Sequence, residues 1–115
     1  VNAVSTGQRS IAMGASSSSV GQYSMALGRY ANSGGDYSIA QGDKSNAAGL
    51  NAIAVGRSSS AAGEKATALG NAAKATEIMS IALGDSANAS KAYSMALVAS
   101  SVASEENAIA LGRSS

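Results

Sequence analysis

The sequence predicts an all-β fold, a parallel β-roll (β-solenoid) built from coils of fourteen residues. A pentapeptide recurs at strict fourteen-residue spacing, from Ser10–Gly14 to Ala108–Gly112. Its five positions are a small residue, an apolar residue, alanine, a second apolar residue and a turn residue. Glycine also occupies every seventh position from Gly7 to Gly70. Alternating small and bulky residues bounded by glycine are typical of short strands joined by turns. A fixed period is the pattern of a solenoid, so we expect residues 1–115 to form a single repeat array of about eight coils.

A coiled coil is the main structural alternative, because fourteen residues also equal two heptads. The bulky residues of each repeat are two positions apart, as in Ile11 and Met13. That spacing places them on different faces of a helix but on the same face of a strand. The residues seven positions further on, such as Ser18, are mostly polar and would leave no apolar seam. Glycine at every seventh residue would also cost a helix about 1 kcal/mol each. We therefore expect two short strands and two turns per coil, with coils stacked about 4.8 Å apart in parallel register.

The alternation within each strand also predicts a thin interior. The first residue of each pentapeptide is Ser or Ala, and the third is Ala in every copy. The second expected strand of each coil also has small side chains, with Ala47 and Ala48 in one coil and Ala61 and Ala62 in the next. Two such faces can pack closely, so Ala and Ser are expected to fill the roll. Glycine at both turns is expected to supply backbone conformations that other residues avoid.

The bulky residues of the pentapeptide are then expected to point out of the roll. The chain has 26 alanines and neither Phe nor Trp, which leaves little material for a conventional core. A continuous apolar stripe has a larger area than the apolar patches that soluble monomers expose. The simplest way to bury it is against the same stripe of another copy of the chain. We therefore expect an obligate homo-oligomer. The predicted subunit interface, which includes the amide of Gln41, comprises Ile11, Met13, Met25, Leu27, Ile39, Gln41, Ile53, Val55, Leu69, Ile81, Leu83, Met95, Leu97, Ile109 and Leu111.

Charged residues at the same spacing would lie above one another in stacked coils. Opposite signs alternate in two such columns, which avoids repulsion between neighbouring coils. Tyr23 and Tyr37 share a third column and are candidates for stacking. Charged residues replace glycine at the second turn, which predicts that this turn changes shape from about Glu77 onward. The first column reads Arg29, Asp43, Arg57, Asn71, Asp85, Ala99 and Arg113, and the second reads Glu77, Lys91 and Glu105.

The composition excludes most of the usual catalytic and metal-binding sites. Cys and His are absent, so we expect no disulfide, no zinc site of the usual kinds and no Ser-His-Asp triad. We expect no enzyme, no catalytic residue, no metal and no cofactor. The net charge of +1 gives no electrostatic footprint for nucleic acid. No apolar run is long enough to cross a bilayer, so no direct membrane contact is expected in this segment.

The repeat resembles the head-domain repeat of trimeric autotransporter adhesins, the YadA-like heads of Gram-negative bacteria. The resemblance rests on the unit Ser-(Ile/Met)-Ala-Leu-Gly and extends from about Ser10 to Gly112. Asn51–Gly56 and Asn107–Gly112 are the segments most similar to the family motif Asn-Ser-Val-Ala-Ile-Gly, whereas Val98 departs from the turn glycine. The resemblance implies a left-handed roll, a homotrimer and display on the outer membrane. It also implies attachment to a host receptor or to an extracellular matrix protein of the collagen, fibronectin or laminin type.

Polar and aromatic turn residues are the candidate ligand contacts, because Tyr and Arg are enriched in binding hot spots. A rigid trimer would present many copies of a weak contact, so avidity would supply firm attachment. The alternative function is a structural spacer that projects another binding domain from the cell surface. The chain begins and ends within a repeat, so we interpret it as a fragment of a longer adhesin whose anchor lies elsewhere. The candidate contacts are Arg29, Tyr30, Asp36, Tyr37, Arg57 and Lys65.

Overall fold

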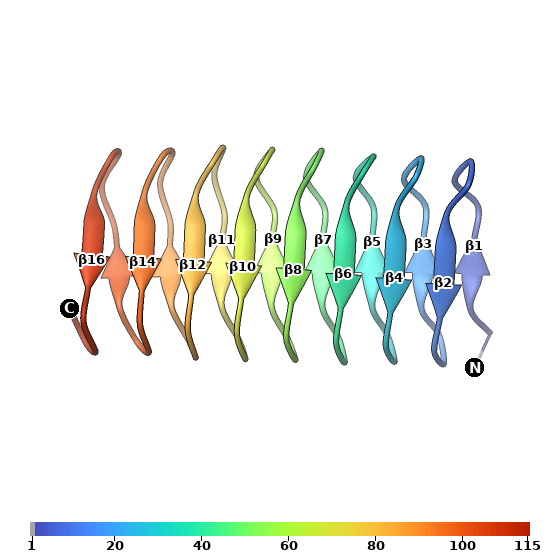
Figure 1. Ribbon diagram of the computed structural model, residues 1–115, viewed down its shortest axis with the longest axis horizontal. Coiled ribbons are helices and arrows are strands. Elements are labelled where there is room, and N and C mark those ends of the chain that lie inside the picture. The colour runs from blue at the N-terminus through green and yellow to red at the C-terminus, as the bar shows by residue number, and fades with distance from the viewer. Residues whose placement is uncertain (1) are drawn as a thin grey trace.

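The computed structural model describes residues 2–115 and shows a roll of two parallel sheets (Figure 1). Val1, the first residue of the predicted repeat array, lies outside the described residues. Residues 2–115 contain sixteen strands and no helix, so the predicted all-β roll is confirmed. One sheet contains β1 (Val4–Ser5), β3 (Ser18–Ser19), β5 (Asn32–Ser33), β7 (Asn46–Ala47), β9 (Ser60–Ala61), β11 (Lys74–Ala75), β13 (Asn88–Ala89) and β15 (Val102–Ala103). The other contains β2 (Ile11–Met13), β4 (Met25–Leu27), β6 (Ile39–Gln41), β8 (Ile53–Val55), β10 (Thr67–Leu69), β12 (Ile81–Leu83), β14 (Met95–Leu97) and β16 (Ile109–Leu111).

Each strand pairs with the strand one coil away, in the register that the sequence period predicts. Ala40 of β6 lies opposite Ala26 of β4 on one side and Ala54 of β8 on the other. The even-numbered strands have three residues rather than the five of the repeated pentapeptide. The ends of the pentapeptide belong to the turns instead, because its glycine takes a positive φ, as at Gly56 (φ 127°).

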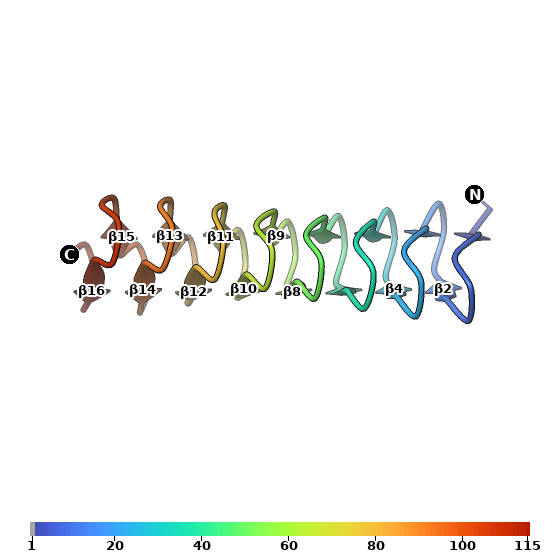
Figure 2. The ribbon, with the colours of Figure 1, turned by 90° about the horizontal axis from the view of Figure 1, so that it is seen from above.

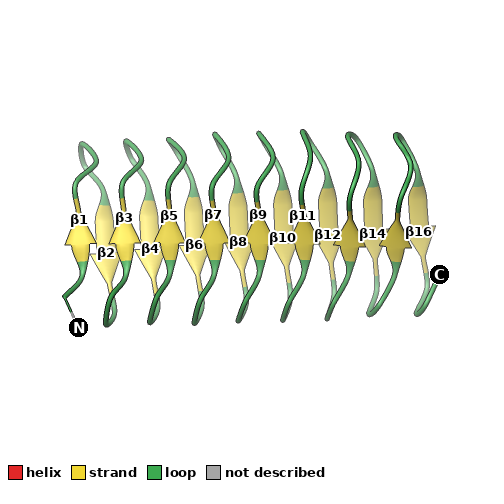
Figure 3. Cartoon of the chain, turned by 180° about the vertical axis from the view of Figure 1, so that it is seen from behind, coloured by secondary structure: helices red, strands yellow, loops and turns green. Residues whose placement is uncertain are grey.

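The coil is left-handed, as the family resemblance implies. In Figure 1 the even-numbered strands run downward in front and the odd-numbered strands upward behind, while the chain advances from right to left. The view from behind in Figure 3 gives the same sense. Parallel crossovers are usually right-handed because a long connection, often a helix, packs back onto a twisted sheet. Here each connection is two tight turns and a two-residue strand, so that packing argument does not apply.

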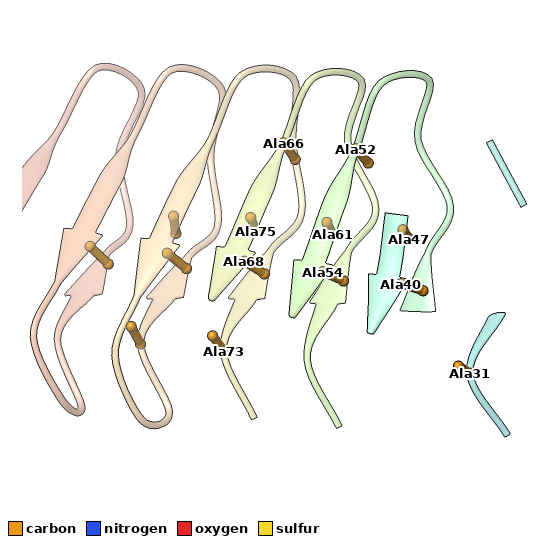
Figure 4. Close-up of a cluster of buried hydrophobic side chains, with 14 of the residues drawn as sticks. Ala31, Ala40, Ala47, Ala52, Ala54, Ala61, Ala66, Ala68, Ala73 and Ala75 are labelled. Carbon is orange, nitrogen blue, oxygen red and sulfur yellow. The ribbon is translucent and has the colours of Figure 1, made fainter. Parts of the chain in front are cut away.

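Figure 2 shows the two sheets as separate layers. The interior between them is filled by alanine, which Figure 4 shows, and by serine, as predicted. The largest fully buried side chains are serines, and the molecule measures 40 × 20 × 12 Å. Interior serines that follow a turn donate a hydrogen bond to the carbonyl three residues earlier, as from Ser24 Oγ to Gly21 O (2.6 Å) and from Ser45 Oγ to Gly42 O (2.9 Å). Within residues 2–115, no buried polar side-chain atom lacks a partner. Serine therefore provides hydrogen-bond donors for the turn carbonyls, and its side chain is small enough to keep the two sheets close together.

The two glycine columns serve different purposes, which corrects the expectation that both supply unusual dihedral angles. Glycine after the even-numbered strands has positive φ, as predicted, whereas Gly49, after an odd-numbered strand, does not. A Cβ on Gly49 would lie 2.0 Å from the carbonyl oxygen of Gly63 in the next coil, so this column is kept small by close backbone approach. The left-handed conformation of that turn belongs to the residue two positions later, such as Asn51 (φ 59°).

The turn after the odd-numbered strands changes from Glu77 onward, as predicted. In the coils of Gly7, Gly21, Gly35 and Gly49 the glycine N–H donates to a carbonyl of the next coil, as from Gly49 N to Ala61 O (3.4 Å). Glu77 N–H instead donates to Oγ of Ser80 in its own turn (3.3 Å). Lys91 N–H does the same with Ser94 Oγ (3.3 Å). The charged side chains are therefore accommodated by a local rearrangement of hydrogen bonds.

Candidate binding surfaces

The outer face of the even-numbered sheet carries the predicted apolar stripe. In β12, Ala82 is fully buried while Ile81 and Leu83 point outward and are partly exposed. All fifteen predicted interface residues lie on this face, and none of them is buried. Exposure is greatest in the terminal coil, reaching 64% at both Ile109 and Leu111. Side chains in the middle coils are partly covered by the equivalent residues above and below them, but their outer surface faces solvent.

Two polar residues interrupt the stripe. Gln41 lies between Leu27 and Val55 in one column and is exposed. Thr67, which the predicted interface omits, lies between Ile53 and Ile81 in the neighbouring column and is partly exposed. The stripe is therefore apolar along its length except at these two positions, since Ile39 and Leu69 remain apolar in the same coils.

The opposite face, formed by the odd-numbered strands, is flat and polar. Its outward residues are mostly Asn, Ser, Thr and Ala, and Asn32 Nδ2 donates to Asn46 Oδ1 of the next coil (3.3 Å). This face contrasts with the apolar stripe across the roll. The asymmetry indicates that the even-numbered sheet is suited to burial in an interface and the odd-numbered sheet to contact with water.

The turns that follow the even-numbered strands form the lower edge of the roll in Figure 1 and carry a charged ladder. Arg29 donates to Asp43 through two bonds, from Nε to Oδ1 (2.9 Å) and from Nη2 to Oδ2 (3.2 Å). The hydrogen bond from Arg29 lowers the pKa of the Asp43 carboxyl, and the same bond raises the pKa of Arg29. The ladder continues from Arg57 Nε to Asn71 Oδ1 (3.2 Å) and from Asn71 Nδ2 to Asp85 Oδ1 (2.9 Å). Neighbours in the predicted column therefore bond at three junctions between coils, while no bond joins Asp43 to Arg57 among residues 2–115.

The second charged column behaves differently. Arg29–Asp43 is the one ion pair found among residues 2–115, so Glu77, Lys91 and Glu105 form none. Their alternating signs avoid repulsion without a direct bond. This column therefore contributes less electrostatic stabilisation between neighbouring coils than the ladder on the lower edge.

The turns that follow the odd-numbered strands form the upper edge, where the predicted tyrosine stack is confirmed. The rings of Tyr23 and Tyr37 are nearly parallel, with centroids 5.3 Å apart and an interplanar angle of 6°. The guanidinium of Arg9 lies 5.7 Å from the centroid of Tyr23, and Arg9 Nη1 donates to the Tyr23 hydroxyl (3.4 Å). Asp36 Oδ1 accepts a hydrogen bond from the Gln22 backbone N–H (2.9 Å) and ties these coils together.

The six predicted ligand contacts do not form one site. Arg29, Tyr30 and Arg57 lie on the lower edge, and Asp36, Tyr37 and Lys65 lie on the upper edge. Asp36 and the two arginines are already engaged in hydrogen bonds within the roll. Arg9, Tyr23 and Tyr93, which are not among the six candidates, share the column of Tyr37 at fourteen-residue spacing.

The structure offers surfaces rather than a cleft. Residues 2–115 enclose no pocket and contain no group of three side chains suited to a metal ion. The same residues contain no helix of the length and apolarity needed to cross a membrane.

Comparison with known proteins agrees with this geometry. The family model of the YadA head domain repeat (2 copies) matches residues 5–31, 33–59, 61–78, 75–97 and 99–115. A similar solved structure is the collagen-binding domain of the Yersinia adhesin YadA, with a TM-score of 0.85 and 27% sequence identity over 97% of this chain and 70% of that chain. Comparison with curated protein sequences finds no significant match. Since the family model covers nearly the whole chain, the chain belongs to the YadA head domain repeat family.

Proposed function

We propose that this chain is the head segment of a bacterial surface adhesin, which attaches the cell to host extracellular matrix protein as a homotrimer. Display is proposed on the outer membrane of a Gram-negative bacterium, through an anchor outside this segment. The action is binding rather than catalysis. The two groups with shifted pKa values form a solvent-exposed ion pair on one edge, which is a structural arrangement and not an acid–base site.

The exposed apolar stripe is the observation that carries the proposal. Full burial of a large aliphatic side chain stabilises a protein by about 1.5–3 kcal/mol. The stripe residues are already partly covered by neighbouring coils, so each gains less, but the stripe runs through all eight even-numbered strands. The interior of Ala and Ser buries little apolar surface per residue. Subunit contact is therefore the main available source of hydrophobic stabilisation.

Membership of the YadA head family supports three as the number of copies, and the similar solved domain supports collagen as the ligand. That solved domain is described as collagen-binding. Fibronectin, laminin and a host receptor are the other ligands to be distinguished. A roll 40 Å long presents its turn residues in many coils, so weak contacts repeated on three subunits would give firm attachment.

Assembly is tested by the variant Leu83→Asp. A charge in the middle of the stripe is costly to bury without a partner, so we expect the trimer to be lost. Light scattering and crosslinking should give a mass near three chains for the natural sequence and a smaller mass for the variant. The matched control is Lys65→Ala on the upper edge, which should remain trimeric. A folded monomer of the natural chain, or a trimer that survives Leu83→Asp, would contradict the proposed assembly.

Ligand binding is tested with the trimer on immobilised triple-helical collagen, fibronectin and laminin. We expect saturable binding to collagen that weakens when the trimer is dissociated. A second experiment deletes two whole coils, residues 38–65, from the intact adhesin so that the register of the repeats is preserved. Attachment that is unchanged after this deletion would favour the spacer function, in which the roll only projects another binding domain.

A further inference from the structure

The apolar stripe repeats in every coil, so two copies of the chain could align on it in several nearly equivalent ways. Its strands stack in one continuous fourteen-residue register. A copy displaced by one coil, about 4.8 Å along the roll, would present the same alternation and lose the overlap of one coil of the eight. An assembly built on this stripe therefore needs a feature that distinguishes one coil from the next.

Gln41 is the strongest such feature. It is exposed on β6, the third of the eight even-numbered strands, and its neighbours in the column are Leu27 and Val55. Its amide offers two N–H donors and an acceptor oxygen. The other polar interruption, Thr67, is a weaker feature because it has a single hydroxyl and a methyl group that packs like that of valine. The coil of Gln41 thus differs in hydrogen-bonding capacity from every other coil of the stripe.

The amide of Gln41 has no hydrogen-bond partner among residues 2–115. Other amides on the roll find a partner one coil away in the same chain, as Gln22 Nε2 does with Gln8 Oε1. The column neighbours of Gln41 are aliphatic and cannot do this. Once the stripe is covered, the amide is either bonded by the covering surface or buried without a partner, which costs free energy.

We propose that the Gln41 amides of the three subunits bond to one another and thereby fix the register of the trimer. The inference rests on the proposed assembly and names the residue that specifies its alignment. In a parallel trimer whose subunits lie at equal height, the three amides share one layer. Each amide can then donate to the next and accept from the previous one, which closes a ring.

Other alignments would leave these amides without partners. A subunit displaced by one coil would bring its Gln41 to the layer of Leu27 or Val55 of the other subunits. A reversed subunit would bring it to another coil as well, because β6 is third from one end of the sheet and sixth from the other. A single buried polar residue specifies register in helical coiled coils in the same way, at some cost in stability.

The first experiment measures whether chains with and without the amide combine. The isotopically labelled natural chain and Gln41→Val are unfolded together, refolded, and counted as trimers by native mass spectrometry. Random combination would put about three-quarters of the trimers in the two mixed compositions. We expect trimers with a single natural chain to be roughly five- to tenfold rarer than random, because their one amide has no partner in any register. Trimers with two natural chains should be less depleted.

The matched control is Gln22→Val. It removes an amide whose partner, Gln8, lies in the same chain, so it should combine with the natural chain at random. Each variant is also refolded alone. Gln41→Val should form trimers by itself, since Val55 shows that valine fits this column.

A second mixture tests register. The double variant Gln41→Val with Val55→Gln keeps the composition and moves the amide by one coil. In a mixture with the natural chain, the amides can meet only if a subunit shifts by one coil. We expect the depleted mixed trimers to recover at least in part, and to melt at a lower temperature than either trimer of identical chains because the end coils lose overlap.

The outcomes separate this inference from the assembly on which it rests. A natural chain that forms no trimer would overturn the assembly itself. Random combination of the natural chain with Gln41→Val would show that the amides do not pair across subunits, while the trimer stands. Equal depletion in the two mixtures would show that register is fixed without Gln41. Depletion with Gln22→Val as strong as with Gln41→Val would likewise contradict the inference.

Discussion

The coils before and after Glu77 close the same turn in two ways. Up to Gly63, this turn contains a glycine whose missing Cβ leaves room for a carbonyl oxygen of the next coil, 2.0–2.1 Å from where the Cβ would be. From Glu77 onward, Glu77, Lys91 and Glu105 occupy the position, and the strands keep the same fourteen-residue register. One fold therefore accepts two local solutions, provided that the hydrogen bonds of the turn are satisfied.

When a charged residue replaces the turn glycine, a hydrogen bond to the next coil is lost, and the residue before it supplies a replacement donor. In the earlier coils the N–H groups of Ala48 and Gly49 both donate to Ala61 O. In the later coils the second donor to the equivalent carbonyl is a hydroxyl, as from Ser90 Oγ to Ala103 O (3.3 Å). The backbone N–H that is released donates to a serine of its own turn. The two kinds of turn thus differ by a paired change of neighbouring residues rather than by a single substitution.

The largest effect is expected from placing a side chain in the earlier kind of turn. In Gly35→Ala the new Cβ would lie 2.1 Å from Gly49 O, and backbone atoms cannot yield without disturbing the ladder. We expect a loss of roughly 2 kcal/mol or more of unfolding free energy. The control Glu77→Ala should be nearly neutral, because a Cβ is already present there. Unfolding is to be measured at one chain concentration, since oligomer stability depends on it. Equal losses in the two variants would contradict the distinction between the turns.

A smaller effect is expected at Val98, the one repeat in which the turn glycine after an even-numbered strand is replaced. Val98 has a φ of 90° and is 49% exposed, so its side chain is strained and contributes little burial. Val98→Gly should relieve the strain and stabilise the chain by about 0.5–1 kcal/mol after the added freedom of the unfolded glycine. Gly70→Ala, at φ 132° in an earlier coil, should be destabilising. A destabilised Val98→Gly variant in thermal unfolding would refute this account.

A still smaller effect tests the paired change at Ser90 and Lys91. Ser90→Ala removes the hydroxyl donor to Ala103 O and should destabilise by about 0.5–1 kcal/mol. Adding Lys91→Gly permits the earlier kind of turn, in which the glycine N–H supplies the second donor. The double variant should therefore be more stable than the sum of the two single variants predicts, in a double-mutant cycle. Ala48→Ser in an earlier coil should have no effect, since Gly49 N–H already donates there. Strict additivity would show that the two positions are independent.

The roll, its register and the outward stripe were predictable because the sequence period leaves little freedom. A fourteen-residue repeat without insertion forces equivalent residues above one another, and strand alternation then separates Ala82 from Ile81 and Leu83. The contact of Arg29 with Asp43 and the stacking of Tyr23 on Tyr37 follow from the same register.

The left-handed φ of non-glycine turn residues was not predictable from residue type. Left-handed φ occurs at residues such as Arg9 and Met79, which have no preference for it, while Gly49 has an ordinary φ. The stacking of coils imposes these angles, so they depend on contacts fourteen residues away rather than on the local sequence. The candidate binding residues are divided between two edges because they follow different turns of the repeat, which the expected two turns per coil already implied.

The smallest effect concerns pH and compares the two parts of the lower-edge ladder. Arg29 and Asp43 form an ion pair in the early coils, whereas Ala99 interrupts the column between Asp85 and Arg113. Because the folded-state pKa of Asp43 is lowered, the pair stabilises the fold above the ordinary Asp pKa of about 4, and this contribution is lost as pH falls below it. Asp43→Asn should therefore reduce the difference in unfolding midpoint between pH 6 and pH 3. Arg29→Gln should reduce it by a similar amount, since either variant removes the pair. Salt should weaken the effect in the natural chain because the pair is exposed. A pH dependence that persists in both variants would assign the acid response to other carboxylates.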